Sequence, residues 1–256
     1  IRNTLRFLLA NLADFDIERH AVAASEMLEI DRYALALAAQ WQSQMCSDYQ
    51  LYEFHPAMSR LQTFCSEDLG AFYLDILKDR LYTTAPDSAQ RRSAQTALWH
   101  ITSALLRLMA PVLSFTSEEA WPLFAPNTHR NAGGTIFTQT WHAFPEIADA
   151  QMLIERWSRL RAIRADVLRE LEAVRSAGGI GSSLQAEVEL TLAPDDHALV
   201  SGLGDDLRFV LITSQARIAA AAQAQPLAIR VEPSKHAKCE RCWHWRADVG
   251  RDAARP

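Results

Sequence analysis

Two cysteines near the end of the sequence, Cys239 and Cys242, have the spacing of metal ligands. The two thiolates of a CxxC turn can bind one ion, and a structural zinc ion needs four ligands in a tetrahedron. A redox pair shares this spacing but would begin a helix within a βαβ unit, whereas this pair follows a predicted strand. The positions of His236 and His244 fit no established ligand spacing. We therefore interpret the pair as half of a zinc site, with a redox pair or incidental cysteines as the alternatives.

The consequence of a half-site is weak metal binding. Because two thiolates cannot complete a tetrahedron, we expect zinc to be absent or substoichiometric in this chain.

The rest of the sequence carries few signs of catalysis. It contains no Gly-rich phosphate loop, no HExxH zinc motif and no GxSxG nucleophile elbow. The carboxylates are scattered, without a pair whose spacing suits acid–base chemistry. Cys46 and Cys65 lie in helical patterns and are expected to be inert, buried thiols. We predict no catalytic residue.

The composition is that of a soluble globular protein. The 256 residues are 49% hydrophobic and 22% charged, and no apolar run is long enough to span a membrane. Four unevenly spaced cysteines favour a reducing, cytosolic compartment. The net charge of −5 does not favour a nucleic-acid partner, although local basic surfaces can still bind RNA. The sequence starts without Met in the middle of a helical pattern, so we expect an excised fragment.

Hydrophobic periodicity predicts a mainly α fold. Residues 1–125 read as successive amphipathic helices, which pack most economically as an antiparallel bundle. Ser66-Glu67-Asp68 is expected to restart a helix, and the Thr116–Glu119 capping box is expected to begin one. Residues 126–177 are predicted to form a connecting loop and a long amphipathic helix whose apolar seam runs from Leu153 to Val174.

The last part changes period and predicts a small α+β module at residues 178–235, followed by a truncated zinc-knuckle segment at 236–256. The stretch AEVELTLA alternates strictly and predicts a half-buried strand. DLRFVLIT and LAIRVE are further predicted strands, and DDHALVSGLG, which lies between AEVELTLA and DLRFVLIT, is predicted to form a short helix.

Six arginines accompany the long helix and allow two interpretations: a solvated face interleaved with glutamates, or contact with phosphates. They are Arg156, Arg159, Arg161, Arg164, Arg169 and Arg175.

Several stretches together carry a family resemblance. KCERCWHWRADVG resembles the C-terminal zinc-knuckle signature of bacterial isoleucyl-tRNA synthetases, KCxRCWHYxxDVG, with Trp245 in place of the usual Tyr. IRNTLRFLLANLADFD is similar to that family's entry into its anticodon-binding bundle. YEFHPAMSRLQTFCSEDLGAFYLDILKDRLYT and APVLSFTSEEAW are similar to it as well, so the resemblance covers nearly the whole chain.

The resemblance implies the C-terminal, tRNA-recognition part of a class I ligase that joins isoleucine to tRNA(Ile) using ATP. The HIGH and KMSKS signatures and the editing insert are absent and would precede Ile1, while the family's second CxxC would follow Pro256. The expected fold is the anticodon-binding bundle of class Ia synthetases. ATP, Mg and a complete zinc site then belong to the longer parent. We expect a non-catalytic, cytoplasmic monomer that binds tRNA(Ile) and neither DNA nor membranes.

Five residues are predicted to contact RNA. Anticodon bases are read by stacking and by edge hydrogen bonds, for which Arg241, Trp243 and His244 have suitable side chains. Alternatively, Trp243 covers the metal. Arg2 and Arg6 are predicted to meet backbone phosphates, with a solvated helix face as the alternative.

Two other classes of protein remain as rivals. A DNA-repair glycosylase of the formamidopyrimidine type ends in a similar zinc finger but requires a β-rich first domain. A helical scaffold with a redox CxxC pair is the other.

Overall fold

The computed structural model describes residues 1–124, 134–221 and 227–251. The chain forms two compact units, residues 1–154 and 155–256, and the boundary between them falls inside one long helix, α8 (Ala150–Ser176). The predicted division into four segments is finer than these two units, and it stays a prediction.

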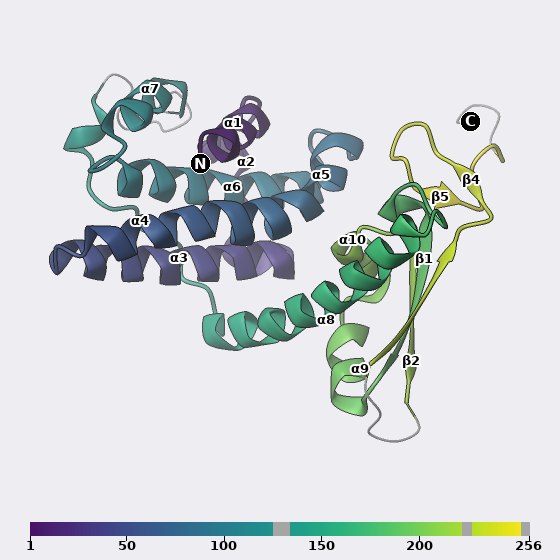
Figure 1. Cartoon of the computed structure of the whole chain (residues 1–256). Helices are drawn as coiled ribbons and strands as arrows, with labels where there is room; N and C mark the ends of the chain where they lie inside the picture. Colours follow the sequence, from purple (N-terminus) through teal and green to yellow (C-terminus); the bar gives the residue numbers. More distant parts are fainter. Residues whose placement is uncertain (125–133, 222–226, 252–256) are drawn as a thin grey trace. The chain divides into compact units, whose positions relative to one another are not determined.

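The first unit is a helical bundle, as predicted (Figure 1). Its elements are α1 (Arg2–Asn11), α2 (Ile17–His20), η1 (Ala24–Glu26), α3 (Glu29–Gln50), α4 (Phe54–Thr63), η2 (Phe64–Tyr73), α5 (Leu74–Thr83), α6 (Ala89–Met109), α7 (Ser114–Phe124) and η4 (Ile136–Thr138).

Helix α6 is the centre of this bundle. It packs against α1, α2, α3, α5 and α7. Consistent with this position, it is buried on nearly all sides over its middle turns, where Ala94, Ala97 and Ala104 let neighbouring helices approach closely. Its first turn is capped by Ser88, whose Oγ accepts a hydrogen bond from the backbone N–H of Arg91.

A buried carboxylate ties four elements of the bundle together. Asp31, at the start of α3, is fully buried. It accepts hydrogen bonds from Tyr73 of η2 at 2.7 Å and from Ser93 of α6 at 2.5 Å. Arg80 of α5 adds a two-pronged ion pair at 2.8 and 2.9 Å. Both carboxylate oxygens of Asp31 therefore have hydrogen-bond partners, and the ion pair with Arg80 offsets the cost of burying the two groups.

Two predicted helix starts are wrong. The chain runs helically from α4 through η2 to α5, and η2 is a stretch of π-helix rather than a break at Ser66–Asp68. Helix α7 begins at Ser114, so the predicted capping box at Thr116–Glu119 lies within it. Instead of capping, Glu118 accepts hydrogen bonds from Thr135 and from the backbone N–H of Ile136.

His142 fastens the segment after η4 to the bundle. Its ring nitrogens lie 2.9 Å from His100 Nδ1 and 2.9 Å from Ser103 Oγ, both on α6. Its backbone carbonyl accepts a hydrogen bond from Gln42 of α3 at 2.7 Å. Burial lowers the pKa of His100 from 6.5 to about 4. Burial, together with the nearby His100 and Arg107, lowers the pKa of His142 to about 3. Both rings are therefore neutral at pH 7.

The second unit combines a three-stranded sheet with helices. Its elements after α8 are η5 (Ser183–Gln185), β1 (Ala186–Leu192), α9 (Pro194–Ser201), η6 (Gly204–Asp206), α10 (Leu207–Leu211), β2 (Gln215–Ala220), β3 (Ala228–Pro233), β4 (Ala237–Lys238) and β5 (Trp245–Arg246). The strand order is β2-β1-β3, with β1 parallel to β2 and antiparallel to β3. The alternation in β1 works as predicted, since Val188, Leu190 and Leu192 are buried.

One of the predicted strands is wrong and another was missed. The DLRFVLIT stretch contains the short helix α10, which buries Leu207, Val210 and Leu211 and ends at Ile212 in a left-handed conformation (φ 57°). Short apolar runs suit a buried strand or a buried helix equally well. The neighbouring β2 was not predicted, because its Ala-rich sequence has weak strand propensity.

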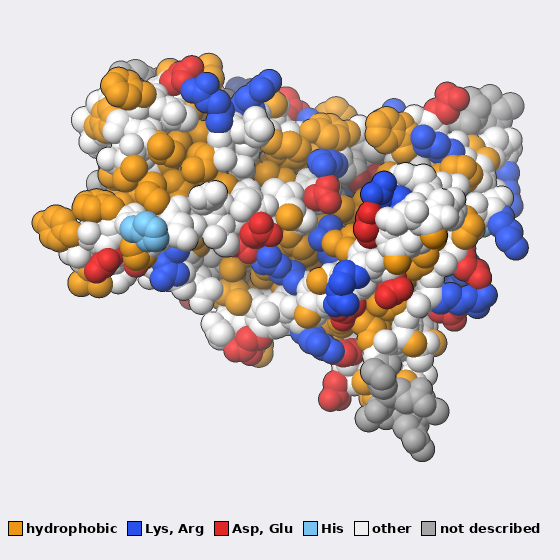
Figure 2. Space-filling view, in the orientation of Figure 1, with side chains coloured by type: hydrophobic (Ala, Val, Ile, Leu, Met, Phe, Trp, Pro, Cys, Tyr) orange, Lys and Arg blue, Asp and Glu red, His pale blue; other side chains and the backbone are white. Residues whose placement is uncertain are grey.

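The arginines of α8 make mostly structural contacts. Arg164 is buried and donates to the carbonyl of Val210, and Arg159 pairs with Asp196. Arg169 and Arg175 pair with Asp166 and Glu172 on the same helix. On the face shown in Figure 2, basic and acidic side chains are interspersed over this helix. The ion pairs of Arg159, Arg169 and Arg175 favour the interpretation as a solvated face interleaved with acidic residues, whereas Arg164 belongs to the packing of the second unit.

The described helices include none with the length and hydrophobicity required to cross a bilayer.

Candidate nucleic-acid interface

The CxxC pair lies in a tight hairpin. Strands β4 and β5 pair in antiparallel fashion, and between them the backbone N–H of Cys239 donates to the carbonyl of His244 at 2.8 Å. The N–H of Trp243 donates back to the carbonyl of Cys239 at 2.9 Å. Trp243 adopts a left-handed conformation (φ 62°), which is uncommon for a bulky residue and shows how sharply the chain turns.

This turn favours a thiolate at Cys239. Hydrogen bonds from the backbone N–H groups of Cys242 and Arg241 lower the pKa of Cys239 below its ordinary value, against the opposing effect of burial. Two thiols on one turn suit half of a tetrahedral zinc site. The described residues contain no cluster of three or more His, Cys, Asp or Glu that would hold a metal. Cys239 and Cys242 are free thiols in the structure, and their role as zinc ligands stays a prediction.

The predicted RNA contact of His244 is not supported by its position. Its side chain is only 3% exposed and packs edge-on against Phe209 of α10, with ring centroids 5.6 Å apart. The ring therefore packs the hairpin against α10 within the second unit, and an RNA contact of His244 stays a prediction.

Trp243 and Arg241, by contrast, face solvent. The Trp243 side chain is 60% exposed, and the ammonium group of Lys238 lies 5.4 Å from its ring centroid. Arg241 is exposed beside it on the same turn. The base of the hairpin is fixed by Ser214, whose Oγ accepts a hydrogen bond from the backbone N–H of Trp245 at 2.6 Å. An aromatic face, an ammonium and a guanidinium are therefore presented on a held turn.

Arg2 and Arg6 lie one turn apart on α1 in the first unit. Arg2 is 72% exposed and reaches Glu119 only at 3.5 Å, and Arg6 is exposed. An exposed pair at this distance contributes little, so Arg2 can exchange it for a phosphate. The predicted contact residues thus fall into two groups, one in each unit.

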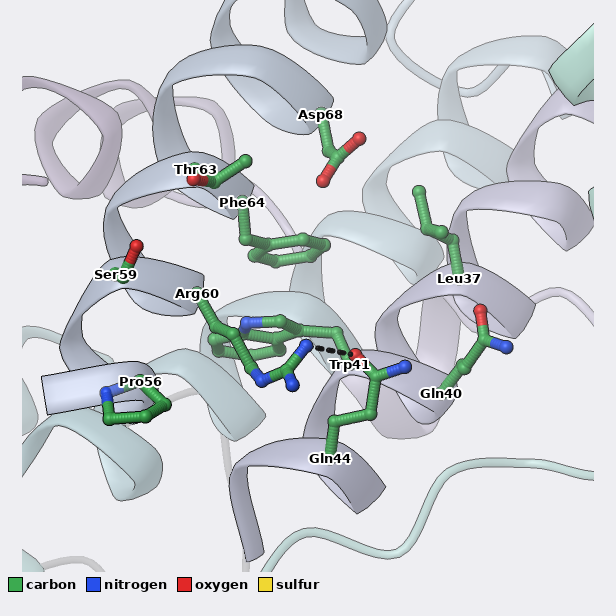
Figure 3. A pocket seen from close by; sticks show the side chains of 10 residues that line it. All are labelled: Leu37, Gln40, Trp41, Gln44, Pro56, Ser59, Arg60, Thr63, Phe64 and Asp68. Atoms are coloured by element: carbon green, nitrogen blue, oxygen red, sulfur yellow. Dashed lines mark hydrogen bonds between the residues drawn. The ribbon is translucent and has the colours of Figure 1, made fainter. Parts of the chain in front are cut away.

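The structure adds a groove that the sequence interpretation missed (Figure 3). It has a volume of about 400 Å³ and lies between α3 and the α4–η2 segment. Helix α3 contributes Leu37, Gln40, Trp41 and Gln44. Their spacing of three and four residues is visible in the sequence, but spacing along one helix does not indicate that a second segment forms a groove with it.

The comparisons with known proteins agree with one another. A family model described as the anticodon-binding domain of tRNA ligase matches residues 31–190. The isoleucine–tRNA ligases of Bordetella petrii and Bordetella avium are each 63% identical over the whole of this chain, which covers 27% of their length. That of Cupriavidus taiwanensis is 60% identical, with 26% of its length covered.

The chain therefore spans about a quarter of the length of the curated relatives it matches. The matched family model covers more than half of the chain, including α3 to α7 of the bundle and β1 of the second unit. The helical first unit also agrees with the anticodon-binding bundle that was expected from the sequence. On this match, the chain belongs to the family of anticodon-binding domains of tRNA ligases.

Proposed function

We propose that this chain is the C-terminal, tRNA-recognition part of an isoleucine–tRNA ligase and that it binds tRNA(Ile) at the anticodon. The observation that carries the proposal is the 58–63% identity to isoleucine–tRNA ligases over the whole chain. The longer parent would attach isoleucine to its tRNA with ATP and Mg, working as a cytoplasmic monomer. The catalytic chemistry would belong to parts outside this chain, and the chain alone would be non-catalytic.

The proposed role of each RNA-contacting residue follows from the chemistry of its exposed side chain. Arg2 and Arg6 would meet backbone phosphates, because they carry exposed guanidinium groups that are not buried in the fold. Trp243 would stack on an unpaired base, and Arg241 would bind a base edge or a phosphate. The left-handed turn and the Ser214 anchor support this assignment, because they fix the direction of the exposed ring.

Cys239 and Cys242 would contribute two thiolates to a zinc site in the parent. The described residues do not complete that site. For this chain alone we expect less than one tightly held zinc per molecule. A stoichiometric, tightly bound zinc measured by elemental analysis would contradict the half-site.

Salt dependence of RNA binding tests the proposal. Affinity for the tRNA(Ile) anticodon stem-loop, measured by fluorescence anisotropy, should fall as salt rises, since phosphate contacts release counterions. Replacing Arg2 and Arg6 together by Gln should lower the slope of log K against log salt by about 1 to 2. Arg19→Gln is the matched control, because Arg19 is exposed on α2 and has only a distant ion pair at 3.7 Å. An affinity for the stem-loop that does not change with salt concentration would contradict the proposal.

Catalysis gives a second readout. The isolated chain should show no isoleucine-dependent pyrophosphate exchange, and exchange above background would show that it can form the adenylate.

A further inference from the structure

A group of apolar side chains at one end of the bundle has no role in the function proposed above. It lies at the turn between α3 and α4 and in the segment after η4, and we call it the aromatic patch. Its members are Tyr49, Leu51, Tyr52, Phe54 and Trp141. The rings of Tyr49 and Trp141 are stacked, with centroids 6.2 Å apart. Phe54 lies 6.1 Å from Tyr49 and 6.3 Å from Tyr52, so the four rings are contiguous.

The aromatic patch is exposed to solvent. Tyr52 is 80% exposed and Leu51 69%, while Phe54 and Trp141 are each about half exposed, at 48% and 46%. Figure 2 shows hydrophobic side chains gathered at the end of the bundle where α3 meets α4. A contiguous apolar patch on a soluble protein marks a surface that another molecule covers. Tyrosine and tryptophan are enriched in such interfaces, because each combines a large apolar ring with one polar group.

The backbone at Tyr52 indicates that its ring is used outside the bundle. Helix α3 ends in a Schellman turn, in which the N–H of Tyr52 donates to the carbonyl of Tyr49 at 3.1 Å. The N–H of Glu53 donates to the carbonyl of Asp48 at 2.8 Å. Tyr52 has a left-handed conformation (φ 59°), at the position of this turn that glycine usually occupies. A bulky residue strains the backbone there, and an exposed ring gains few contacts within the chain to offset that strain.

The charges around the aromatic patch disfavour RNA. None of its members is basic, and Glu53 adds an exposed carboxylate between Tyr52 and Phe54. On α4, Arg60 is already paired with Asp48 at 2.8 Å. RNA binding draws much of its affinity from basic groups that neutralise phosphates, whereas an apolar protein surface requires none. The patch therefore fits a protein surface better than a nucleic acid.

The direction of α1 indicates which part of a longer chain can reach the patch. The last turn of α1 lies at the start of α6, where Gln95 donates to the carbonyl of Asn11 at 2.9 Å. Since α1 also packs against α7, which follows α6, α1 begins toward the end of α6. The hydroxyl of Tyr49 donates to the carbonyl of Leu108 at 2.6 Å, which places the patch at that same end. A segment joined to Ile1 therefore arrives at the end of the bundle that carries the patch.

We propose that the aromatic patch docks against an apolar surface of the catalytic part of the same ligase, which precedes Ile1, and so fixes the bundle relative to the active site. The proposal rests on the function proposed above. It is supported by the share of length that is matched, because this chain covers only 27% of the Bordetella petrii ligase. Tyr52 is the anchor, with its ring held in a pocket of the catalytic part.

Hydroxyl-radical footprinting without RNA tests the docking by comparing the isolated chain with the full-length parent. Tyr52 and Trp141 should be roughly fivefold less reactive in the parent, because anchors at the centre of an interface are fully desolvated. Tyr82 of α5 is the matched control, since it is 61% exposed and lies 3.5 Å from Asn11, away from the patch. It should react equally in both proteins.

Three footprinting results would overturn the proposal. The first is equal reactivity of Tyr52 in the parent and the isolated chain. The second is protection of Tyr52 that appears only after tRNA is added, which would make the patch an RNA site. The third is protection that is already present in the isolated chain and is lost on dilution, which would make a second copy the occupant.

The Tyr52→Gly variant separates docking from folding. Because glycine fits the left-handed position, the variant should leave the Tm of the isolated chain unchanged or raise it. In the parent, it should bring the reactivity of Trp141 close to that in the isolated chain, whereas Tyr82→Ala should leave Trp141 protected. A lower Tm of the isolated Tyr52→Gly chain would show that the ring serves the bundle itself and would contradict the proposal.

Attachment of isoleucine by the parent distinguishes this proposal from the function on which it rests. A parent that charges tRNA(Ile) but leaves Tyr52 fully reactive would overturn the docking and leave the proposed function intact. A parent that does not attach isoleucine would overturn the proposed function and the docking with it.

Discussion

Acid should destabilise the first unit through His142 and His100. Both imidazoles are neutral in the fold, with pKa values of about 3 and 4, whereas an unfolded histidine titrates near 6.5. The unfolded state therefore takes up protons that the folded state excludes as the pH falls below 6.5. The stabilisation is fully present above pH 6.5 and is lost progressively down to about pH 4 to 3.

The magnitude follows from these pKa values. At pH 5, each excluded proton costs about 2 kcal/mol relative to pH 7.5, so the pair costs about 4 kcal/mol. His142→Gln removes one titrating group and should leave an acid loss of at most about 2 kcal/mol attributable to His100. Other groups that titrate in this range are common to both proteins, and they cancel in the difference.

The assay is urea unfolding at pH 7.5, 6.5 and 5, followed by far-UV circular dichroism. Because the chain has two units, hydrogen-exchange mass spectrometry of α6 assigns the relevant transition to the first. His55→Gln is the control, since His55 is exposed on α4. If His142→Gln loses as much stability as the wild type between pH 7.5 and pH 5, the reasoning from burial is refuted.

Three further predictions concern single side chains. Asp31→Ala should lower the free energy of unfolding of the first unit by about 3 to 5 kcal/mol, because Arg80 and Tyr73 lose a buried partner; a loss under 1 kcal/mol in urea unfolding would contradict this. The Cys65 thiol, whose pKa burial raises to about 11, should resist Ellman's reagent at pH 8 in the native chain while Cys239 and Cys242 react; rapid labelling of Cys65 would show that the bundle opens there. Ser214→Ala should speed amide exchange at Trp245 by about fivefold, because a hydrogen bond worth about 1 kcal/mol is lost; unchanged exchange would mean that the hairpin is held by other contacts.

The bundle could be predicted from sequence because its signal is local and repeated. Leucine and alanine recur at helical spacing through the first unit, and several such stripes can be buried only against one another. The strand β1 was equally clear, since strict alternation over seven residues fits a half-buried strand and nothing else.

The failures arose where distant contacts decide the outcome. The helix at Leu207–Leu211 looks like a strand because a short apolar run fits either, and its packing settles the choice. For His244, no pattern in the sequence indicates that Phe209, thirty-five positions earlier, packs against its ring; its RNA contact stays a prediction. The groove exists only where α3 packs beside the α4–η2 segment, and the spacing of residues along either segment does not indicate this packing.

The Cys239–Cys242 turn was predicted correctly in part. Spacing alone predicted that the thiols share one turn, and the hairpin agrees. Spacing could not indicate that backbone N–H groups favour a thiolate at Cys239 or that Trp243 is turned outward, since both depend on the conformation of the turn.

Anticodon discrimination tests the central claim most directly. The chain should bind the tRNA(Ile) anticodon stem-loop at least tenfold more tightly than the same stem-loop with its three anticodon bases exchanged, because a base read by its edge is worth about 1 to 3 kcal/mol. Identical affinities for the two stem-loops, at matched salt, would contradict recognition of the anticodon by this chain.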